Sequence, residues 1–271
     1  MLSPNYVLNT TFEIKLSAIS LKNYIQQQSR NGRKMLAVLV DPDKANEAQL
    51  DSLISQPSFK EIDFLFVGGS LVTDGHMRSC LKQLKLRTNK PLVIFPGSPN
   101  QIDNTADAIL LLSLISGRNP DLLIGRHVES AYKLKRSELE IFSTGYILID
   151  GGRTTTVSYI SGTVPIPQDK PGIAASTALA GTMLGNEFIY LDCGSGALQY
   201  ADPKLVSAVK KEIDAPLIVG GGIRTKQAAK EIFESGADVV VVGNKLEENP
   251  TFLEELVAVK NHFKRTPAQT L

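Results

Sequence analysis

Residues Phe188–Gly196, FIYLDCGSG, contain the pattern that decides the fold. The four apolar residues Phe188–Leu191 predict a strand buried on both faces, which ends at a carboxylate, Asp192, and a turn of small residues. Apolar runs followed by glycine recur at Pro216–Gly222 and at Val239–Asn244. Strand, glycine turn and helix, repeated in this way, are typical of a parallel α/β barrel that binds a phosphate group.

Outward from this stretch, the chain alternates short apolar runs with helical segments. The expected strands are Met35–Val40, Ile62–Val67, Pro91–Phe95, Ala108–Leu112, Gly145–Ile149, Phe188–Leu191, Pro216–Val219 and Val239–Val242. The expected helices are Ala18–Arg30, Ala45–Ser55, Thr73–Leu86, a short one opened by Ser98-Pro99, Pro120–Lys135, Ile173–Leu184, Pro203–Ile213, Lys226–Ser235 and Pro250–Lys264. The alternation predicts a parallel sheet. The number of strands favours closure into a (β/α)8 TIM barrel over an open sheet.

A single domain is expected for the whole chain of 271 residues, because this length is typical of one barrel and no linker divides it. Residues 1–34 are expected to form a lead-in and a helix, and residues 35–264 the barrel. Thr154–Gly172, which contains three prolines, is expected to be a long loop. Loops of this length in a compact domain are usually functional or mobile.

Composition argues against several classes of function. The formal net charge is +1 and there is no block of like charges, so a nucleic-acid surface is not expected. The apolar runs are far shorter than the roughly 18 residues of a membrane span, and the N-terminal residues lack a secretory signal pattern. Two cysteines give no disulfide framework, and three scattered histidines argue against a zinc site. A cytoplasmic protein without a transmembrane segment is expected.

The carboxyl ends of the strands carry the function of such a barrel. The residues expected there are Asp41, Gly68–Ser70, Phe95–Gly97, Ser113, Asp150–Arg153, Asp192, Gly220–Gly222 and Gly243-Asn244. Glycines follow the last three strands, and carboxylate or hydroxyl groups follow the first two. Because the first and eighth strands are neighbours in a closed barrel, a phosphate-binding half is expected beside an oxygen-rich half. The turn at Asp150–Arg153 fits a second anion site and a plain turn equally well.

Each of these groups also has a purely structural interpretation. Gly220–Gly222 with Gly243 favour phosphate binding through backbone N–H groups, the alternative being tight strand-to-helix turns. Asp41 with Ser70 is a candidate Mg²⁺–diphosphate site, and the alternative is that Asp41 caps the next helix. Cys193 is better explained as a small packing residue than as a nucleophile, because no histidine stands near it in the sequence.

Five motifs in this order resemble the geranylgeranylglyceryl phosphate synthase family, which also contains the bacterial heptaprenylglyceryl phosphate synthases. They are LVDPDK at Leu39–Lys44, VGGS at Val67–Ser70, FIYLDCGSG at Phe188–Gly196, VGGGIRT at Val219–Thr225 and VVGNK at Val241–Lys245. The stretch LLSLISGRNPDLLIGRHVESA at Leu111–Ala131 resembles the larger group of that family. The similarity covers roughly residues 35–245, which is nearly the whole expected barrel.

The resemblance implies a prenyltransferase of ether phospholipid biosynthesis. Such an enzyme joins sn-glycerol 1-phosphate to geranylgeranyl diphosphate, or to a related polyprenyl diphosphate, and releases diphosphate with the help of Mg²⁺. The family's metal positions fall on Asp41 and Ser70. Its glycerol phosphate positions fall on Tyr190, Leu191, Asp192, Cys193, Gly194, Ser195, Gly196, Gly221, Gly222, Gly243 and Asn244. The family often has glutamate where this chain has Asp192, and alanine where it has Cys193.

The chemistry of that reaction suggests roles for two carboxylates. An allylic diphosphate leaves readily when Mg²⁺ neutralises its charge, which would make Asp41 catalytic. The primary hydroxyl of glycerol phosphate then attacks the allylic carbocation, and Asp192 is a candidate to accept its proton or to orient it. The prenyl tail needs an apolar trench, for which Phe95, Leu114 and Ile115 are candidate lining residues. The resemblance also implies a homo-oligomer, dimeric or hexameric. A transient contact with a membrane surface during product release is expected as well.

Two other classes of protein are alternatives at this stage. One is another phosphate-handling barrel enzyme, such as a sugar-phosphate isomerase, synthase or aldolase. A Schiff-base aldolase needs a lysine on a barrel strand, and no expected strand contains one. The other is a barrel that binds phosphate without catalysis, in which Asp41 and Asp192 would be dispensable. Release of diphosphate from a labelled prenyl substrate discriminates among them.

Overall fold

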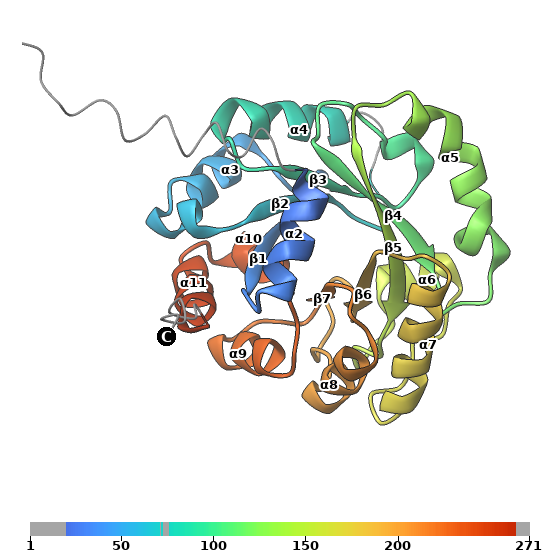
Figure 1. Cartoon of the computed structure of the whole chain (residues 1–271). Coiled ribbons are helices and arrows are strands. Elements are labelled where there is room, and N and C mark those ends of the chain that lie inside the picture. Colours follow the sequence, from blue (N-terminus) through green and yellow to red (C-terminus); the bar gives the residue numbers. More distant parts are fainter. Residues whose placement is uncertain (1–19, 71, 73–75, 264–271) are drawn as a thin grey trace, which may run out of the picture.

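Eight parallel strands form a closed barrel in chain order, surrounded by helices (Figure 1). The computed structural model describes residues 20–70, 72 and 76–263. The strands are β1 Met35–Val40, β2 Phe64–Gly68, β3 Leu92–Phe95, β4 Ala108–Leu114, β5 Glu140–Leu148, β6 Phe188–Asp192, β7 Leu217–Gly220 and β8 Val239–Val242. Parallel pairing of β1 with β8, in which Ala37 lies opposite Val241, closes the ring. The predicted (β/α)8 TIM barrel is confirmed.

Most helices agree with the expected ones, and the main differences are short helices that were not expected. They are α2 Leu21–Arg30, α3 Glu47–Ile54, α4 His76–Arg87, α5 Arg126–Lys135, α6 Thr156–Ser161, α7 Pro171–Met183, α8 Pro203–Glu212, α9 Lys226–Glu234, α10 Asn244–Glu248 and α11 Phe252–His262, with 3₁₀ helices η1 Pro57–Glu61 and η2 Pro99–Gln101. The short helix after Ser98 is confirmed. The single helix expected over 120–135 is instead a π-helical turn, η3 Asp121–Gly125, followed by α5. The starts expected at Ala18 and Thr73 and the end at Lys264 lie outside the described residues.

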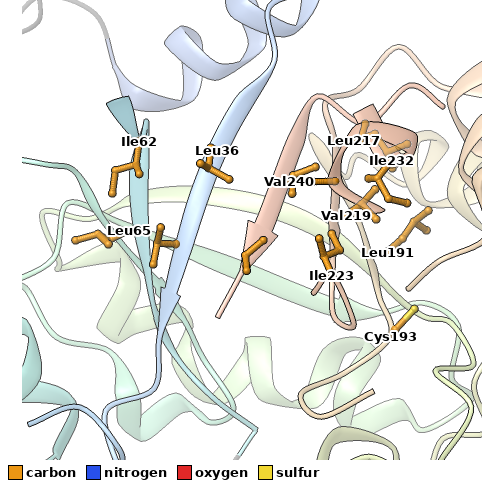
Figure 2. Close-up of a cluster of buried hydrophobic side chains, with 14 of the residues drawn as sticks. Leu36, Ile62, Leu65, Leu191, Cys193, Leu217, Val219, Ile223, Ile232 and Val240 are labelled. Carbon is orange, nitrogen blue, oxygen red and sulfur yellow. The ribbon is translucent and has the colours of Figure 1, made fainter. Parts of the chain in front are cut away.

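Alternation along the strands divides the core into two layers. One set of side chains points outward against the helices, as Leu36, Leu65 and Val240 do in Figure 2. The other set points inward and fills the barrel. This inner set includes six aromatic residues, which are at most 5% exposed: Phe64, Phe66, Phe142, Tyr146, Phe188 and Tyr190. Large rings therefore fill the interior up to the end at which the strands finish.

Three aspartates hold the amino ends of the strands together. Each accepts a backbone N–H from the start of the preceding strand and pairs with a lysine from a helix. The sets are Asp63 with Leu36 and Lys260, Asp107 with Leu92 and Lys85, and Asp238 with Leu217 and Lys210. This end of the barrel is thus tied by charged groups, and the opposite end is left for binding.

Helix α2 lies over the amino end of the barrel (Figure 1). The carboxylate of Glu140, at the start of β5, accepts the N–H groups of Leu21 and Lys22 at 2.7 and 2.9 Å. The ammonium of Lys22 lies 3.0 Å from the Glu187 carboxylate, and Ile25 is buried among the inner side chains. The amino end is therefore closed. Among the described residues, no helix has the length and apolar character needed to cross a bilayer.

Candidate active site

A small polar cavity lies at the carboxyl ends of β6, β7 and β8 and encloses about 40 Å³. Eight of the predicted glycerol phosphate residues line it: Tyr190, Asp192, Ser195, Gly196, Gly221, Gly222, Gly243 and Asn244. The hydroxyl of Ser195 donates to the side-chain oxygen of Asn244 at 3.0 Å, so the turns after β6 and β8 touch directly. The structure thus brings together residues that are more than 50 positions apart in the chain.

Three of the predicted residues do not line this cavity. Leu191 and Cys193 point outward into the layer between barrel and helices, where Figure 2 labels both. Burial raises the pKa of the Cys193 thiol far above its ordinary value. This environment agrees with a packing role for Cys193 and not with a nucleophile. Gly194 contributes its backbone N–H, which donates to Asp192 at 2.7 Å.

The glycines after β7 are required by the geometry of the backbone. Gly221 and Gly222 have φ values of +79° and +72°, which side-chain-bearing residues rarely adopt. A Cβ atom on Gly221 would lie 2.8 Å from a carboxylate oxygen of Asp192, and one on Gly222 would lie 2.3 Å from the carbonyl oxygen of Gln199. Gly243 has an ordinary φ of −125°, and a Cβ atom there would come no closer than 3.2 Å to Leu39.

Positive groups border the polar cavity. Arg224 follows the glycine turn after β7, and Lys245 lies in the first turn of α10, which begins directly after Gly243. Backbone N–H groups at a helix N-terminus favour anions, as do these two side chains. Sequence reasoning did not single out Arg224 or Lys245, although both lie within the glycine motifs. The cavity therefore offers what a phosphate group needs.

The carboxylate of Asp192 lies buried beneath this cavity and is 7% exposed. It accepts a short hydrogen bond from the Tyr146 hydroxyl and a second hydrogen bond from the N–H of Gly194. Burial raises the pKa of Asp192, and these two hydrogen bonds partly offset the rise. Burial also raises the pKa values of Tyr146 and Tyr190, as does the neighbouring charge of Asp192. Asp192 is thus a buried carboxylate held firmly by two hydrogen bonds.

A second, larger cavity of about 260 Å³ runs from the end of β3 along β4 towards α5 and α6. Its walls are mostly apolar and include Leu110, Leu112, Leu114, Leu122, Leu134, Val157 and Ile160. Leu114 and Phe95 are two of the three predicted trench residues. The third, Ile115, lines a surface groove beside α7 instead. Among the described residues, Phe95 is the only one that lines both cavities, so the apolar trench and the polar cavity meet there.

The two predicted metal residues follow neighbouring strands but do not line the same cavity. Asp41 borders a cavity between β1, α3 and α10, whereas Ser70 borders the trench. The Asp41 carboxylate accepts the N–H of Asp43 at 3.1 Å and lies 3.1 Å from the Lys44 ammonium. The alternative that Asp41 caps the next helix is wrong, because Asn46 caps α3. No group of three or more His, Cys, Asp or Glu side chains in the described part of the chain is arranged to hold a metal.

Comparison with known proteins places this arrangement in a family. The PcrB family matches residues 28–260. The chain is 48% identical over 239 residues to a geranylgeranylglyceryl phosphate synthase from Spirosoma linguale, a match that covers 88% of this chain and 96% of that protein. It is 38% identical over 229 residues to one from Thermococcus kodakarensis, covering 84% and 90% respectively.

A solved structure agrees in fold and sequence. It is the crystal structure of (S)-3-O-geranylgeranylglyceryl phosphate synthase from Thermoplasma acidophilum in complex with its substrate sn-glycerol-1-phosphate. The two chains superpose with a TM-score of 0.83 at 31% identity, covering 92% of this chain and all of that one. The resemblance indicated by the five motifs is confirmed, and the chain belongs to the PcrB family, together with relatives named geranylgeranylglyceryl phosphate synthase.

Proposed function

We propose that this protein joins sn-glycerol 1-phosphate to geranylgeranyl diphosphate, or to a related polyprenyl diphosphate, through an ether bond. The observation that carries the proposal is the meeting of two unlike cavities at Phe95, beside the buried Asp192. The larger apolar trench suits a prenyl chain. The smaller polar cavity, with its glycines and cationic side chains, suits the phosphate of a three-carbon substrate.

In this reaction the residues where the two cavities meet position the glycerol hydroxyl and receive its proton. The bond between C1 of the prenyl chain and the diphosphate oxygen breaks, and the electron pair leaves with the diphosphate. The primary hydroxyl oxygen of glycerol phosphate bonds to C1, and its proton passes to the Asp192 carboxylate. Tyr146 and Gly194 hold that carboxylate in place through their hydrogen bonds.

We propose that Mg²⁺ is held by Asp41 and Ser70, the residues that the sequence assigned to it. Mg²⁺ binds through one or two protein oxygens and completes its shell with water and substrate phosphate, so the Asp41 carboxylate and the Ser70 hydroxyl are a chemically suitable pair. The Asp41 side chain is 23% exposed and follows a strand paired directly with the one before Ser70. When bound, the ion would neutralise the charge of the leaving diphosphate.

Asp41→Asn is expected to raise the Mg²⁺ concentration for half-maximal activity by about 10–100-fold, because the anionic ligand is lost. The matched control is Asp43→Asn, two residues away, which is expected to leave the Mg²⁺ requirement near that of the wild type. The measurement is initial rate against Mg²⁺ concentration after chelator treatment. A wild-type Mg²⁺ curve for Asp41→Asn would remove Asp41 from the metal site.

Gly221→Ala is expected to raise KM for glycerol 1-phosphate about tenfold or more, while KM for the prenyl diphosphate stays nearly unchanged. The added methyl group would press on Asp192 and would also cost about 1–3 kcal/mol of stability, because of the positive φ. Gly185→Ala is the matched control for backbone strain, since Gly185 also has a positive φ, 94°, but lies just after α7 and lines neither cavity. If Gly221→Ala raises KM for both substrates equally, the variant is misfolded and the result does not support a phosphate site at Gly221.

Tyr146→Phe is expected to move the acidic limb of the pH–rate profile to higher pH. Asp192 accepts a proton only when ionised, so activity is present above its pKa and is lost as the pH falls through it. Burial already raises the pKa of Asp192, and removal of the Tyr146 donor raises that pKa further. Tyr200→Phe is the control, since the Tyr200 hydroxyl donates to Glu231 away from the site. An acidic limb that stays in place would argue against Asp192 as the titrating base.

The activity itself is tested with prenyl diphosphates of several lengths and both enantiomers of glycerol phosphate. We expect an ether-linked product and diphosphate, formed preferentially from sn-glycerol 1-phosphate, and detected by mass spectrometry. Asp192→Asn serves as the negative control. Binding of glycerol phosphate without product from any prenyl diphosphate would favour a non-catalytic barrel. Turnover of phosphorylated sugars instead would favour another phosphate-handling enzyme.

A homo-oligomeric assembly and a transient membrane contact during product release stay predictions. Light scattering coupled to size-exclusion chromatography measures the first. Cosedimentation of protein and freshly formed product with vesicles measures the second. Neither outcome alters the assignment of the reaction.

A further inference from the structure

Four aromatic rings gather where the two cavities meet, and we name them the junction rings: Phe66, Phe95, Tyr146 and Tyr190. They come from four different strands, β2, β3, β5 and β6. The ring centroids of Phe95 lie 5.3 Å from those of Tyr190, 5.8 Å from Tyr146 and 6.3 Å from Phe66. The centroids of Tyr146 and Tyr190 lie 5.5 Å apart. The junction rings therefore form one continuous cluster.

Phe95 is the most exposed member of this cluster. It is half-buried, whereas the other three rings are at most 5% exposed. Its main chain is fixed by β2, because a Cβ atom on Gly68 would lie 1.9 Å from the carbonyl oxygen of Phe95, so only glycine permits this approach. Since Phe95 lines both cavities, the reacting carbon of the prenyl chain and the glycerol hydroxyl have to meet against it.

The charges around the cluster favour a positive charge at this point. Of the junction rings and the carboxylate beside them, only Asp192 carries a formal charge. The cations Arg224 and Lys245 border the phosphate cavity, on segments that follow β7 and β8. A cation formed in a buried place needs compensation, and the negative faces of aromatic rings provide it. Asp192 already accepts two hydrogen bonds, which makes it a weaker competitor for the cation than a free carboxylate.

We propose that Phe95, backed by Tyr190, is a catalytic residue that stabilises the allylic cation through its ring. The inference rests on the proposed prenyl transfer. When the C1–O bond breaks, its electron pair leaves with the diphosphate and positive charge spreads over three carbons of the prenyl chain. The Phe95 ring attracts this charge without forming a bond. The glycerol hydroxyl oxygen then bonds to C1, its proton passes to Asp192, and the ring is unchanged.

Two probes separate this role from simple packing. A prenylamine, charged as the ammonium ion, mimics the cation, and the prenyl alcohol of the same length is its neutral counterpart. Both are titrated into the full-length protein in the presence of inorganic diphosphate. In Phe95→Leu, binding of the ammonium ion is expected to weaken about tenfold more than binding of the alcohol. Phe95→Tyr keeps an aromatic ring and is expected to bind the ammonium ion and the alcohol with the same relative affinity as the wild type. Leu122→Ala, in the trench wall, is expected to weaken both probes equally.

Kinetics give a second measurement on the same variants. Phe95→Leu is expected to lower kcat about tenfold with little change in KM for the prenyl diphosphate, because the ring acts on the cation and not on the ground state. Phe95→Met, also without a ring, repeats both tests if the leucine variant does not fold. The inference is overturned if the wild-type protein forms ether product but these variants bind the ammonium ion and the alcohol equally weakly relative to it. Failure of the proposed function itself is distinguishable, since wild-type protein would then form no ether product.

Discussion

Asp192→Asn is expected to lower kcat for ether formation by roughly 10²–10⁴-fold, because the side chain keeps its shape but no longer accepts a proton. The carboxylate is buried and held by two donors, so no water or neighbouring base replaces it easily. The amide would also have to share its single oxygen between Tyr146 and Gly194. The measurement is kcat for each variant at saturating concentrations of both substrates.

Asp192→Ala is expected to erode the preference for sn-glycerol 1-phosphate over its mirror image as well. A site that binds a hydroxyl group rejects a partner that misplaces it, since the buried polar group is then left unpaired. Comparing product from the two enantiomers measures this effect. Leu198→Ala, an exposed residue of the same loop that lines neither cavity, is a suitable control for the general effect of a truncation there. If Asp192→Ala keeps both rate and preference, the carboxylate is only a structural group in the turn after β6.

Lys260→Met is expected to lower the free energy of unfolding by about 3–5 kcal/mol, the second large effect. The Lys260 ammonium lies 2.9 Å from the carboxylate of Asp63, and the two side chains are 3% and 4% exposed. It also donates to the carbonyl oxygen of Glu61 in a short contact. Removing the lysine leaves the Asp63 charge buried without its main partner. Urea denaturation monitored by circular dichroism measures the loss.

The exposed pair at the same end of the barrel provides the control. Lys85 and Asp107 lie 2.7 Å apart but are 36% and 41% exposed, so Lys85→Met is expected to cost at most about 1 kcal/mol. Lys260→Met combined with Asp63→Asn is expected to recover part of the stability, since no unpaired charge is then buried. Equal losses for the two lysine variants would show that burial does not decide the strength of these pairs. Activity per folded molecule should be unaffected, because the site lies at the opposite end.

Most of the barrel could be predicted because its strands are short runs of apolar residues. The main error in the strands is β5, which begins at Glu140 and not at Gly145, since Ser143 and Thr144 interrupt the apolar pattern. Helices α6 and α10 were missed because they contain only six and five residues, too few to establish a helical period. A capping box between Thr155 and Ser158 starts α6 within the expected loop, but its Ser at the third position is a weak indication in sequence.

The site was predictable where residues end a strand or directly follow one, as Asp192 and the glycines do. Tyr146 was missed because it lies inside β5. Its link to Asp192 appears only once the register of β5 on β6 is known, with Tyr146 opposite Tyr190, two residues before the carboxylate on the same face. Arg224 and Lys245 were missed because 29 lysine and arginine residues are present, so residue type alone does not select them. The trench could not be located because its walls combine strands and helices distant in the chain.

The attachment of α2 to the far side of the barrel has a consequence for synthesis on the ribosome. Helix α2 is made early, but its carboxylate partners, Glu140 and Glu187, are made much later. Lys22 and Glu187 are 165 residues apart, which corresponds to roughly 8–33 s of translation at about 5–20 residues per second. Throughout that interval Ile25 has no barrel interior to enter. The docking of α2 should therefore be among the last steps of co-translational folding.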